Sequence, residues 1–300
     1  MGLCDGRVVI VTGAGRGIGR AHALAFAAEG AKVVVNDLGV SLAGEDASDT
    51  PAHEVVAEIE AAGGEAVVNG ADVADFEQAG SLVKTAIDTF GGLDVVVNNA
   101  GVVRDRMFVS TSEEEWDAVI RVHLKGHFCV SNHACAFWRG KSKAGEPVDA
   151  RIINTSSGAG LQGSVGQSAY SAAKAGIANL TLIQAVELGR YGITSNAIAP
   201  SARTRMTEEV FADMMKKPES GFDAMAPENV SPLVVWLGSA ESREVTGRVF
   251  EVAGGSISIA DGWREGPVVD KGARWAPDEV GAAVSDLIAK AVPPQKVYGS

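Results

Sequence analysis

The sequence is poor in cysteine. Its three cysteines are Cys4, Cys129 and Cys135, and none stands in a CxxC pair or at the cysteine–histidine spacing of a zinc site. An odd, sparse set provides no disulfide framework and is typical of a reducing compartment. We therefore expect neither a disulfide nor a metal site.

The sequence also lacks an excess of positive charge and a long apolar run. Its 26 basic residues are outnumbered by 38 acidic ones, which gives a net charge of −12. Because basic surfaces capture phosphate backbones, nucleic-acid binding is not expected. No run is long enough to cross a bilayer, and the apolar run from Val8 to Val11 is too short for a signal peptide. We predict a cytoplasmic protein with no nucleic-acid or membrane partner.

Apolar residues are abundant and fall in short runs. They make up 46% of the chain, which is enough for a large buried core. Short runs rich in valine and isoleucine alternate with longer helical patterns, and most are apolar throughout, as strands buried on both faces are. The predicted strands are 7–12, 31–37, 65–69, 93–98, 150–155, 194–199 and 248–252. The predicted helices are 20–29, 54–61, 76–90, 113–138, 169–190 and 228–237. This alternation predicts an α/β fold, a doubly wound parallel sheet of about seven strands with helices on both faces.

We expect one domain and an extension. Residues 1–255 contain all the predicted strands, and residues 256–300 are predicted to be a C-terminal extension packed on the same domain. One helix should open at Pro277, since proline at a first helical position followed by Asp278 and Glu279 is a typical helix start.

A glycine-rich loop follows the first predicted strand and opens the first predicted helix. It reads Thr12-Gly13-Ala14-Gly15-Arg16-Gly17-Ile18-Gly19. Glycines allow a tight turn and let a pyrophosphate approach the helix N-terminus, where free N–H groups bind anions. The loop predicts a Rossmann-type dinucleotide site.

Asp37 indicates which dinucleotide is bound. It ends the second predicted strand, 18 residues after Gly19. A carboxylate there accepts hydrogen bonds from the adenosine ribose and repels the 2′-phosphate of NADP. Arg16 could pair with that phosphate instead, but a carboxylate facing the ribose should outweigh a flexible loop cation. We predict NAD as the cofactor.

The glycine spacing resembles that of the short-chain dehydrogenase/reductase family, whose loop is T-G-x-x-x-G-x-G. The resemblance covers residues 6–255 and extends to Asn98-Asn99-Ala100-Gly101 and to Asp72-Val73. One departure is Pro200-Ser201, where the family has Pro-Gly. The implied cofactor-binding residues are Gly13, Arg16, Gly17, Ile18, Gly19, Asp37, Asp72, Val73, Asn98, Ala100, Gly101, Tyr170, Lys174 and Pro200.

The same resemblance implies that Ser157, Tyr170 and Lys174 are catalytic. Tyr170 and Lys174 are four residues apart on a helical pattern and share one face, and Ser157 lies 13 residues before Tyr170. A phenol titrates near pH ~10, so a neighbouring ammonium and the oxidised nicotinamide should lower its pKa toward working pH. Ser157 would hold the substrate oxygen. Ser156 is a possible substitute for Ser157, whose spacing fits the family better.

His123 is a second departure from the family pattern. The stretch 122–126 reads Val-His-Leu-Lys-Gly, where the family usually has V-N-L-x-G. That asparagine holds a water linking the lysine to solvent, and a neutral imidazole could hold the same water. We predict that His123 replaces the asparagine. The alternative, that it only packs in its helix, stays open.

The substrate is suggested by one branch of the family, the (3R)-hydroxyacyl-CoA dehydrogenase module of peroxisomal multifunctional enzyme type 2. The chain resembles it at 33–39, 104–106, 122–126, 198–200 and 205–207. This implies a 3-hydroxyacyl thioester, such as an acyl-CoA. Reduction of carrier-bound 3-oxoacyl groups or another carbonyl, and a non-catalytic nucleotide sensor, stay open.

Two further expectations concern packing. Loop 201–227 holds Met206, Met214, Met215 and Met225, and either closes over an apolar substrate or packs on its own subunit. The family implies a homodimer or homotetramer built on the helices predicted at 113–138 and 169–190, with the extension lying over a subunit boundary or the substrate pocket.

Overall fold

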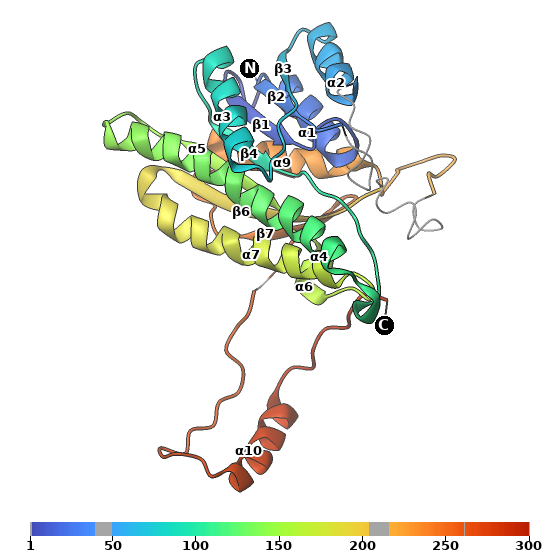
Figure 1. Ribbon diagram of the computed structural model, residues 1–300, viewed down its shortest axis with the longest axis vertical. Coiled ribbons are helices and arrows are strands. Elements are labelled where there is room, and N and C mark those ends of the chain that lie inside the picture. The colour runs from blue at the N-terminus through green and yellow to red at the C-terminus, as the bar shows by residue number, and fades with distance from the viewer. Residues whose placement is uncertain (1, 40–49, 204–215, 261, 300) are drawn as a thin grey trace.

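A single eight-stranded sheet organises the computed structural model, which describes residues 2–39, 50–203, 216–260 and 262–299 (Figure 1). The strand order is β3-β2-β1-β4-β5-β6-β7-β8. The strands are β1 Val8–Thr12, β2 Lys32–Asn36, β3 Glu65–Asn69, β4 Val95–Asn98, β5 Ala150–Thr155, β6 Ile193–Ser201, β7 Val249–Ala253 and β8 Ser256–Ile259. The first seven are parallel, and β8 is antiparallel to β7. The predicted Rossmann-type doubly wound sheet is confirmed, with β8 as an unexpected addition.

Helices cover both faces of the sheet. They are α1 Gly17–Ala28, α2 Thr50–Ala61, α3 Phe76–Phe90, α4 Glu113–Ile120, α5 Gly126–Lys143, α6 Gly158–Gln162, α7 Ser168–Leu188, α9 Ser231–Gly238 and α10 Pro277–Lys290. One core layer lies between the sheet and α1, α2 and α9, and another between the sheet and α3 and α5. Successive valines of β1 and β4 alternate between the two layers, which explains why these strands are apolar throughout.

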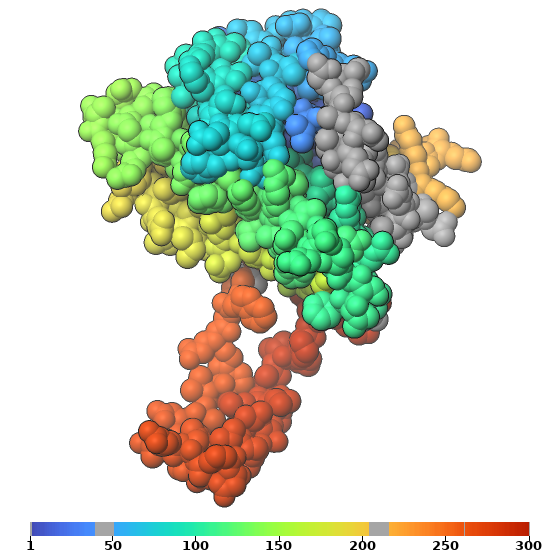
Figure 2. Space-filling view, in the orientation of Figure 1, coloured from blue at the N-terminus to red at the C-terminus, as the bar shows by residue number. Residues whose placement is uncertain are grey.

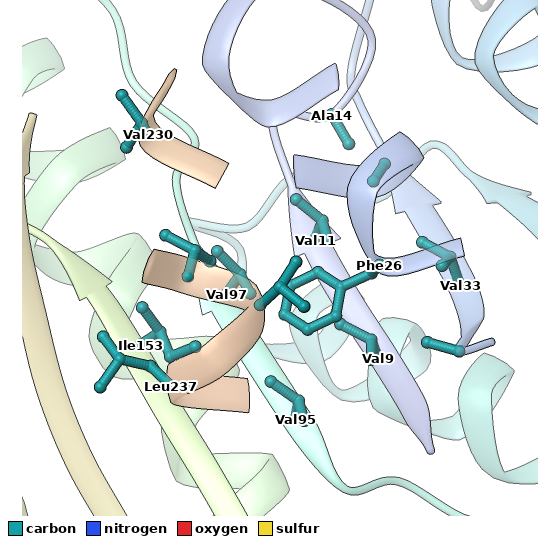
Figure 3. Packing of buried hydrophobic residues seen from close by; sticks show 14 of the residues in the cluster. Val9, Val11, Ala14, Phe26, Val33, Val95, Val97, Ile153, Val230 and Leu237 are labelled. Carbon is teal, nitrogen blue, oxygen red and sulfur yellow. The ribbon is translucent and has the colours of Figure 1, made fainter. Parts of the chain in front are cut away.

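Phe26 shows how the first layer is packed. Its fully buried ring lies among the valines of β1 and β4 (Figure 3). A β-carbon added at Gly238 would lie 2.5 Å from this ring, so the glycine lets α9 approach α1. Burial of such a side chain stabilises the fold by about 1.5–3 kcal/mol.

The helix predicted over 113–138 is interrupted. α4 begins at a capping box formed by Ser112 and Glu115, and a π-helical turn, Arg121–Lys125, separates it from α5. The turn contains His123. Such insertions into α-helices occur frequently at functional sites.

The extension leaves the domain and returns to it. After β8 the chain runs outward, and α10 has no buried residue (Figure 2). The chain then comes back, and Tyr298 pairs with Ser164. The helix expected at Pro277 is confirmed. The division into a domain of 1–255 and a packed extension of 256–300 stays a prediction.

Some expectations lie outside the described residues. These include the part of the methionine-bearing loop that holds Met206, Met214 and Met215. Among the described helices, none is both long and apolar enough to cross a membrane.

Candidate active site

The glycine loop lies at the carboxyl end of β1, where the strand order reverses between β1 and β4. Gly13 has a φ of 62°, and a β-carbon there would lie 2.8 Å from the Cα of Ala100. A β-carbon at Gly19 would lie 2.1 Å from the carbonyl oxygen of Gly13. The tight turn therefore requires glycine at both positions, and it forms the cradle that a dinucleotide needs at such a switch point.

Asn99 and Thr12 hold this cradle in shape. The Asn99 side-chain amide donates to the carbonyl oxygens of Thr12 at 3.0 Å and Gly13 at 3.2 Å. The Thr12 hydroxyl accepts from the backbone N–H groups of Asn99 and Ala100. Sequence reasoning selected Asn98 for cofactor binding and not Asn99, although both belong to the same motif.

Asp37 lies beside the loop, as its position after β2 predicts. Its carboxylate accepts from the backbone N–H of Gly15 at 2.8 Å and of Gly39 at 2.7 Å. Arg16 is exposed at the start of α1. A glycine cradle with a carboxylate beside it fits a nicotinamide dinucleotide.

The other predicted cofactor residues occupy varied positions. Asp72 accepts from the backbone N–H of Ala74 and forms an ion pair with Arg121. Val73 is buried, and Pro200 lies in β6 opposite Val252. These residues lie at the carboxyl ends of strands or in the turns that follow them.

Asn98 points into the protein core. Its side-chain amide donates to Ser131 Oγ at 2.9 Å and to Asn154 Oδ1 at 3.0 Å, and Asn98 is buried. Ala100 faces Gly13, and a β-carbon at Gly101 would lie 2.3 Å from the His123 ring. The side chain of Asn98 therefore links β4 to β5 and α5 within the core. Its role in cofactor binding stays a prediction.

Ser157 and Tyr170 come together. Ser157 follows β5 and caps α6, where its hydroxyl accepts from the Ala159 N–H at 3.2 Å. Its side chain lies near enough to the Tyr170 phenol to lower the phenol pKa. Ser156, the alternative, is buried and donates to the Lys174 carbonyl oxygen at 2.8 Å. The geometry favours Ser157.

Lys174 is buried one turn after Tyr170 on α7, with 2% of its surface exposed. Its Nζ donates to the Thr155 carbonyl oxygen at 2.6 Å and lies 5.5 Å from the centre of the Tyr170 ring. Burial lowers the pKa of Lys174 to about 7. The amine is therefore poised to gain or lose a proton near neutral pH.

The Tyr170 phenol differs from the sequence expectation in the protein without cofactor. Burial raises its pKa, and the Asp105 carboxylate adds to the rise while the Ser157 hydrogen bond opposes it. Burial disfavours the charged phenolate, and this effect is the largest. The lowered phenol pKa expected from Lys174 and the nicotinamide stays a prediction for the complex.

His123 lies against Tyr170, with ring centres 5.2 Å apart and the rings perpendicular. Its Nε2 is 2.8 Å from the Val102 carbonyl oxygen, and its buried Nδ1 has no partner among the described residues. Burial, together with Lys174, lowers the pKa of His123 to about 3, so the ring is neutral at pH 7. The π-helical turn thus brings His123 to the site, while its role in a proton relay stays a prediction.

His127 is a neighbour that sequence reasoning missed. Its Nε2 accepts from the Thr155 N–H at 3.3 Å, and backbone groups of His123 and Asn98 also hydrogen-bond the ring. Burial, and then Lys174, lowers its pKa well below the usual value. A neutral His127 therefore joins the ends of β4 and β5 to the π-helical turn. The four-residue spacing from His123 was the only signal for it.

The arrangement places a hydroxyl, a phenol and a buried amine next to a dinucleotide cradle at one edge of the sheet. Such a set can hold an alcohol or carbonyl oxygen and exchange its proton while a nicotinamide exchanges a hydride. Fold and site together define an oxidoreductase of the Rossmann type.

Comparison with known proteins identifies the family. The family model described as short chain dehydrogenase matches residues 7–215. The chain is 45% identical over 294 residues to the hydroxyacyl-CoA dehydrogenase ChsB1 of Mycobacterium tuberculosis, covering 97% of this chain and 91% of that protein. It is 50% identical over 253 residues to peroxisomal multifunctional enzyme type 2 of Mus musculus, covering 84% of this chain and 32% of that enzyme.

A solved structure agrees. A short chain dehydrogenase from Mycobacterium avium matches with a TM-score of 0.90 and 68% identity over the whole of both chains. The chain belongs to the short-chain dehydrogenase family. It is an oxidoreductase acting on CH–OH groups, and the family implies a nicotinamide cofactor.

Proposed function

We propose that this protein uses NAD to interconvert the secondary alcohol of a 3-hydroxyacyl thioester, such as an acyl-CoA, and the corresponding ketone. The observation that carries this proposal is that Ser157 and buried Lys174 both lie next to Tyr170, with the Lys174 Nζ 5.5 Å from the centre of its ring. The thioester is supported by two relatives, one named a hydroxyacyl-CoA dehydrogenase and the other a multifunctional enzyme whose dehydrogenase module the sequence resembles.

Each residue has a distinct part in the proposal. Ser157 donates a hydrogen bond to the substrate oxygen and holds it beside Tyr170. The Tyr170 oxygen takes the hydroxyl proton during oxidation and returns it during reduction. Lys174, whose pKa is about 7, stabilises the phenolate when charged and relays the proton. Bound NAD supplies the hydride acceptor.

Preference for NAD rests on Asp37. Its carboxylate lies beside the Gly15 N–H, where it can accept from ribose hydroxyls and where a 2′-phosphate would be repelled. The exposed Arg16 side chain would lose more conformational entropy on binding that phosphate than Asp37, which backbone N–H groups already hold in place. Asp37 also weighs against carrier-bound 3-oxoacyl reduction, which family members usually perform with NADPH.

The non-catalytic sensor is the second candidate, and the intact side-chain set weighs against it. Self-association is supported by exposed apolar residues on α7, Leu182, Ile183 and Val186. A homodimer or homotetramer therefore stays a prediction, which light scattering at micromolar concentration tests. The cytoplasmic location also stays a prediction.

A substrate panel tests the proposed function. NADH formation is followed with 3-hydroxyacyl-CoAs, sterols and simple secondary alcohols under identical conditions, with NADP as the parallel cofactor. We expect the highest kcat/KM for a 3-hydroxyacyl-CoA with NAD. Turnover of sterols or simple alcohols alone would assign another substrate, and NAD binding without any turnover would support the sensor.

A further inference from the structure

The segment 297–299 docks beside the predicted catalytic residues. The Val165 N–H donates to the Tyr298 carbonyl oxygen at 2.9 Å, and the Tyr298 N–H donates to the Gly163 carbonyl oxygen at 3.1 Å. These bonds make a parallel bridge between Ser164 and Tyr298. The segment thus pairs with the stretch of chain that connects Ser157 to Tyr170.

Gly158 on that stretch lies close to the segment. A β-carbon at Gly158 would lie 2.8 Å from the Tyr298 hydroxyl oxygen, whereas one at Gly163 would make only an ordinary contact with Val297 at 3.4 Å. Gly158 immediately follows Ser157. The Tyr298 ring therefore lies against the backbone beside the hydroxyl that is predicted to hold the substrate oxygen.

A cavity of about 280 Å³ opens at this contact. Its walls are Asp105 to Met107, Ser164 to Gln167, and Tyr298 with Gly299. Asp105 lies near enough to Tyr170 to influence its pKa, and Gln167 donates to the Asp105 carboxylate at 2.8 Å. The cavity therefore lies against the stretch of chain between Ser157 and Tyr170, and the extension supplies one of its sides.

We propose that segment 297–299 is a wall of the substrate site and that Tyr298 is a specificity-determining residue, whose ring contacts the substrate beyond the reacting carbon. A small secondary alcohol reaches Ser157 and Tyr170 without touching this wall. A long 3-hydroxyacyl thioester fills the cavity and lies against the ring. The proposal rests on the proposed function for the identity of that longer substrate.

The kinetic test compares substrates of different length in Tyr298→Ala, Tyr298→Phe and Ile288→Ala. Ile288 lies on α10 with 70% of its surface exposed and serves as the matched control in the extension. For the longest 3-hydroxyacyl-CoA that is turned over, Tyr298→Ala should raise KM about tenfold with a smaller change in kcat. Tyr298→Phe should restore most of the loss, because the ring fills the same space. For 2-butanol, all three variants should stay within about twofold of the unmutated protein.

An equal loss with long and short substrates would show that Tyr298 only supports the Ser157 segment and would overturn the proposal. So would Tyr298→Phe behaving like Tyr298→Ala. If thioesters are not substrates, the proposed function fails. The role of Tyr298 is then tested with secondary alcohols of increasing length, by comparing the effect of Tyr298→Ala on KM for the longest and the shortest alcohol. Hydrogen exchange gives an independent check: the Val165 amide should be protected in the unmutated protein, and exchange at the rate of a free peptide would show that the segment is not docked.

Discussion

The glycine loop and the segment from Ser157 to Lys174 lie at the same edge of the sheet and are built in opposite ways. The loop is shaped by backbone: glycines at close approaches, with the neutral side chains of Asn99 and Thr12 holding the turn. The Ser157–Lys174 segment instead depends on a buried amine and on neutral histidines from α5 and the π-helical turn. On the proposed function, the loop would bind through its backbone shape, and the segment would transfer protons through buried groups that can be charged.

Tyr170→Phe should separate the two regions with the largest effect. The phenol hydroxyl is lost while the ring and the glycine loop remain, so kcat should fall by about a hundredfold or more and the Kd for NAD should not change. Initial rates of NADH formation and calorimetric titration measure the two quantities. Retention of more than about a tenth of kcat would show that another group handles the proton.

A second prediction concerns a buried histidine on α1, the helix that follows the glycine loop, and the effect of acid on stability. His22 on α1 is fully buried against Ser231, at 2.9 Å, and burial lowers its pKa to about 3. The unfolded chain, with a pKa near ~6.5, binds more protons between pH ~3 and ~6.5, so stability is lost as pH falls through this window. From pH 7 to 5 the loss should be about 2 kcal/mol for His22 alone.

Urea unfolding at pH 7 and pH 5 measures this effect. His22→Asn removes the titrating group, and its pH-dependent loss should be smaller than that of the unmutated protein by the same amount. Parallel pH dependence in the two proteins would mean that His22 does not titrate as its burial predicts.

Asp37→Ala tests the carboxylate beside the glycine loop. The unmutated protein should bind NAD at least about tenfold more tightly than NADP, which corresponds to about 1.4 kcal/mol. Removal of the carboxylate ends the repulsion of the 2′-phosphate and should narrow the gap. Calorimetry with both dinucleotides measures it, and a preference for NADP in the unmutated protein would refute the assignment.

His123 tests whether the neutral histidines act in proton transfer or only in packing. On the relay interpretation, His123→Ala lowers kcat by about tenfold, and His123→Asn recovers much of the loss by restoring the family's usual amide. The pH profile of kcat should shift with the alanine variant. An unchanged kcat and profile would make His123 a structural residue.

The sequence-based predictions succeeded where a pattern is local. Glu65–Asn69, Ala150–Thr155 and Phe76–Phe90 match the predicted elements, because their periodicity and boundaries lie within each segment. The π-helical turn at Arg121–Lys125 was missed because helical periodicity continues across it. β8 was missed because Ser256–Ile259 is short and exposed, so it lacks the apolar signature of the other strands.

Side-chain direction limited the prediction of the site. Asn98 and Asn99 are adjacent, yet one enters the core network and the other holds the glycine loop, and only tertiary structure distinguishes them. The partners of His127 come from Thr155 and Asn98 on two separate strands, so no local pattern shows them. The spacing of Ser157, Tyr170 and Lys174 is visible in the sequence, whereas the pKa shifts of Tyr170 and Lys174 follow from burial in the fold.

The division between binding and chemistry is tested most directly by measuring the NAD Kd and kcat side by side in Gly19→Ala and Tyr170→Phe. A β-carbon at Gly19 would lie 2.1 Å from the Gly13 carbonyl oxygen, so the loop must move. We predict that Gly19→Ala raises the Kd by about tenfold or more and loses far less kcat at saturating NAD, whereas Tyr170→Phe keeps the Kd and loses kcat. If both variants change the Kd and kcat together, the two regions do not divide the work as proposed.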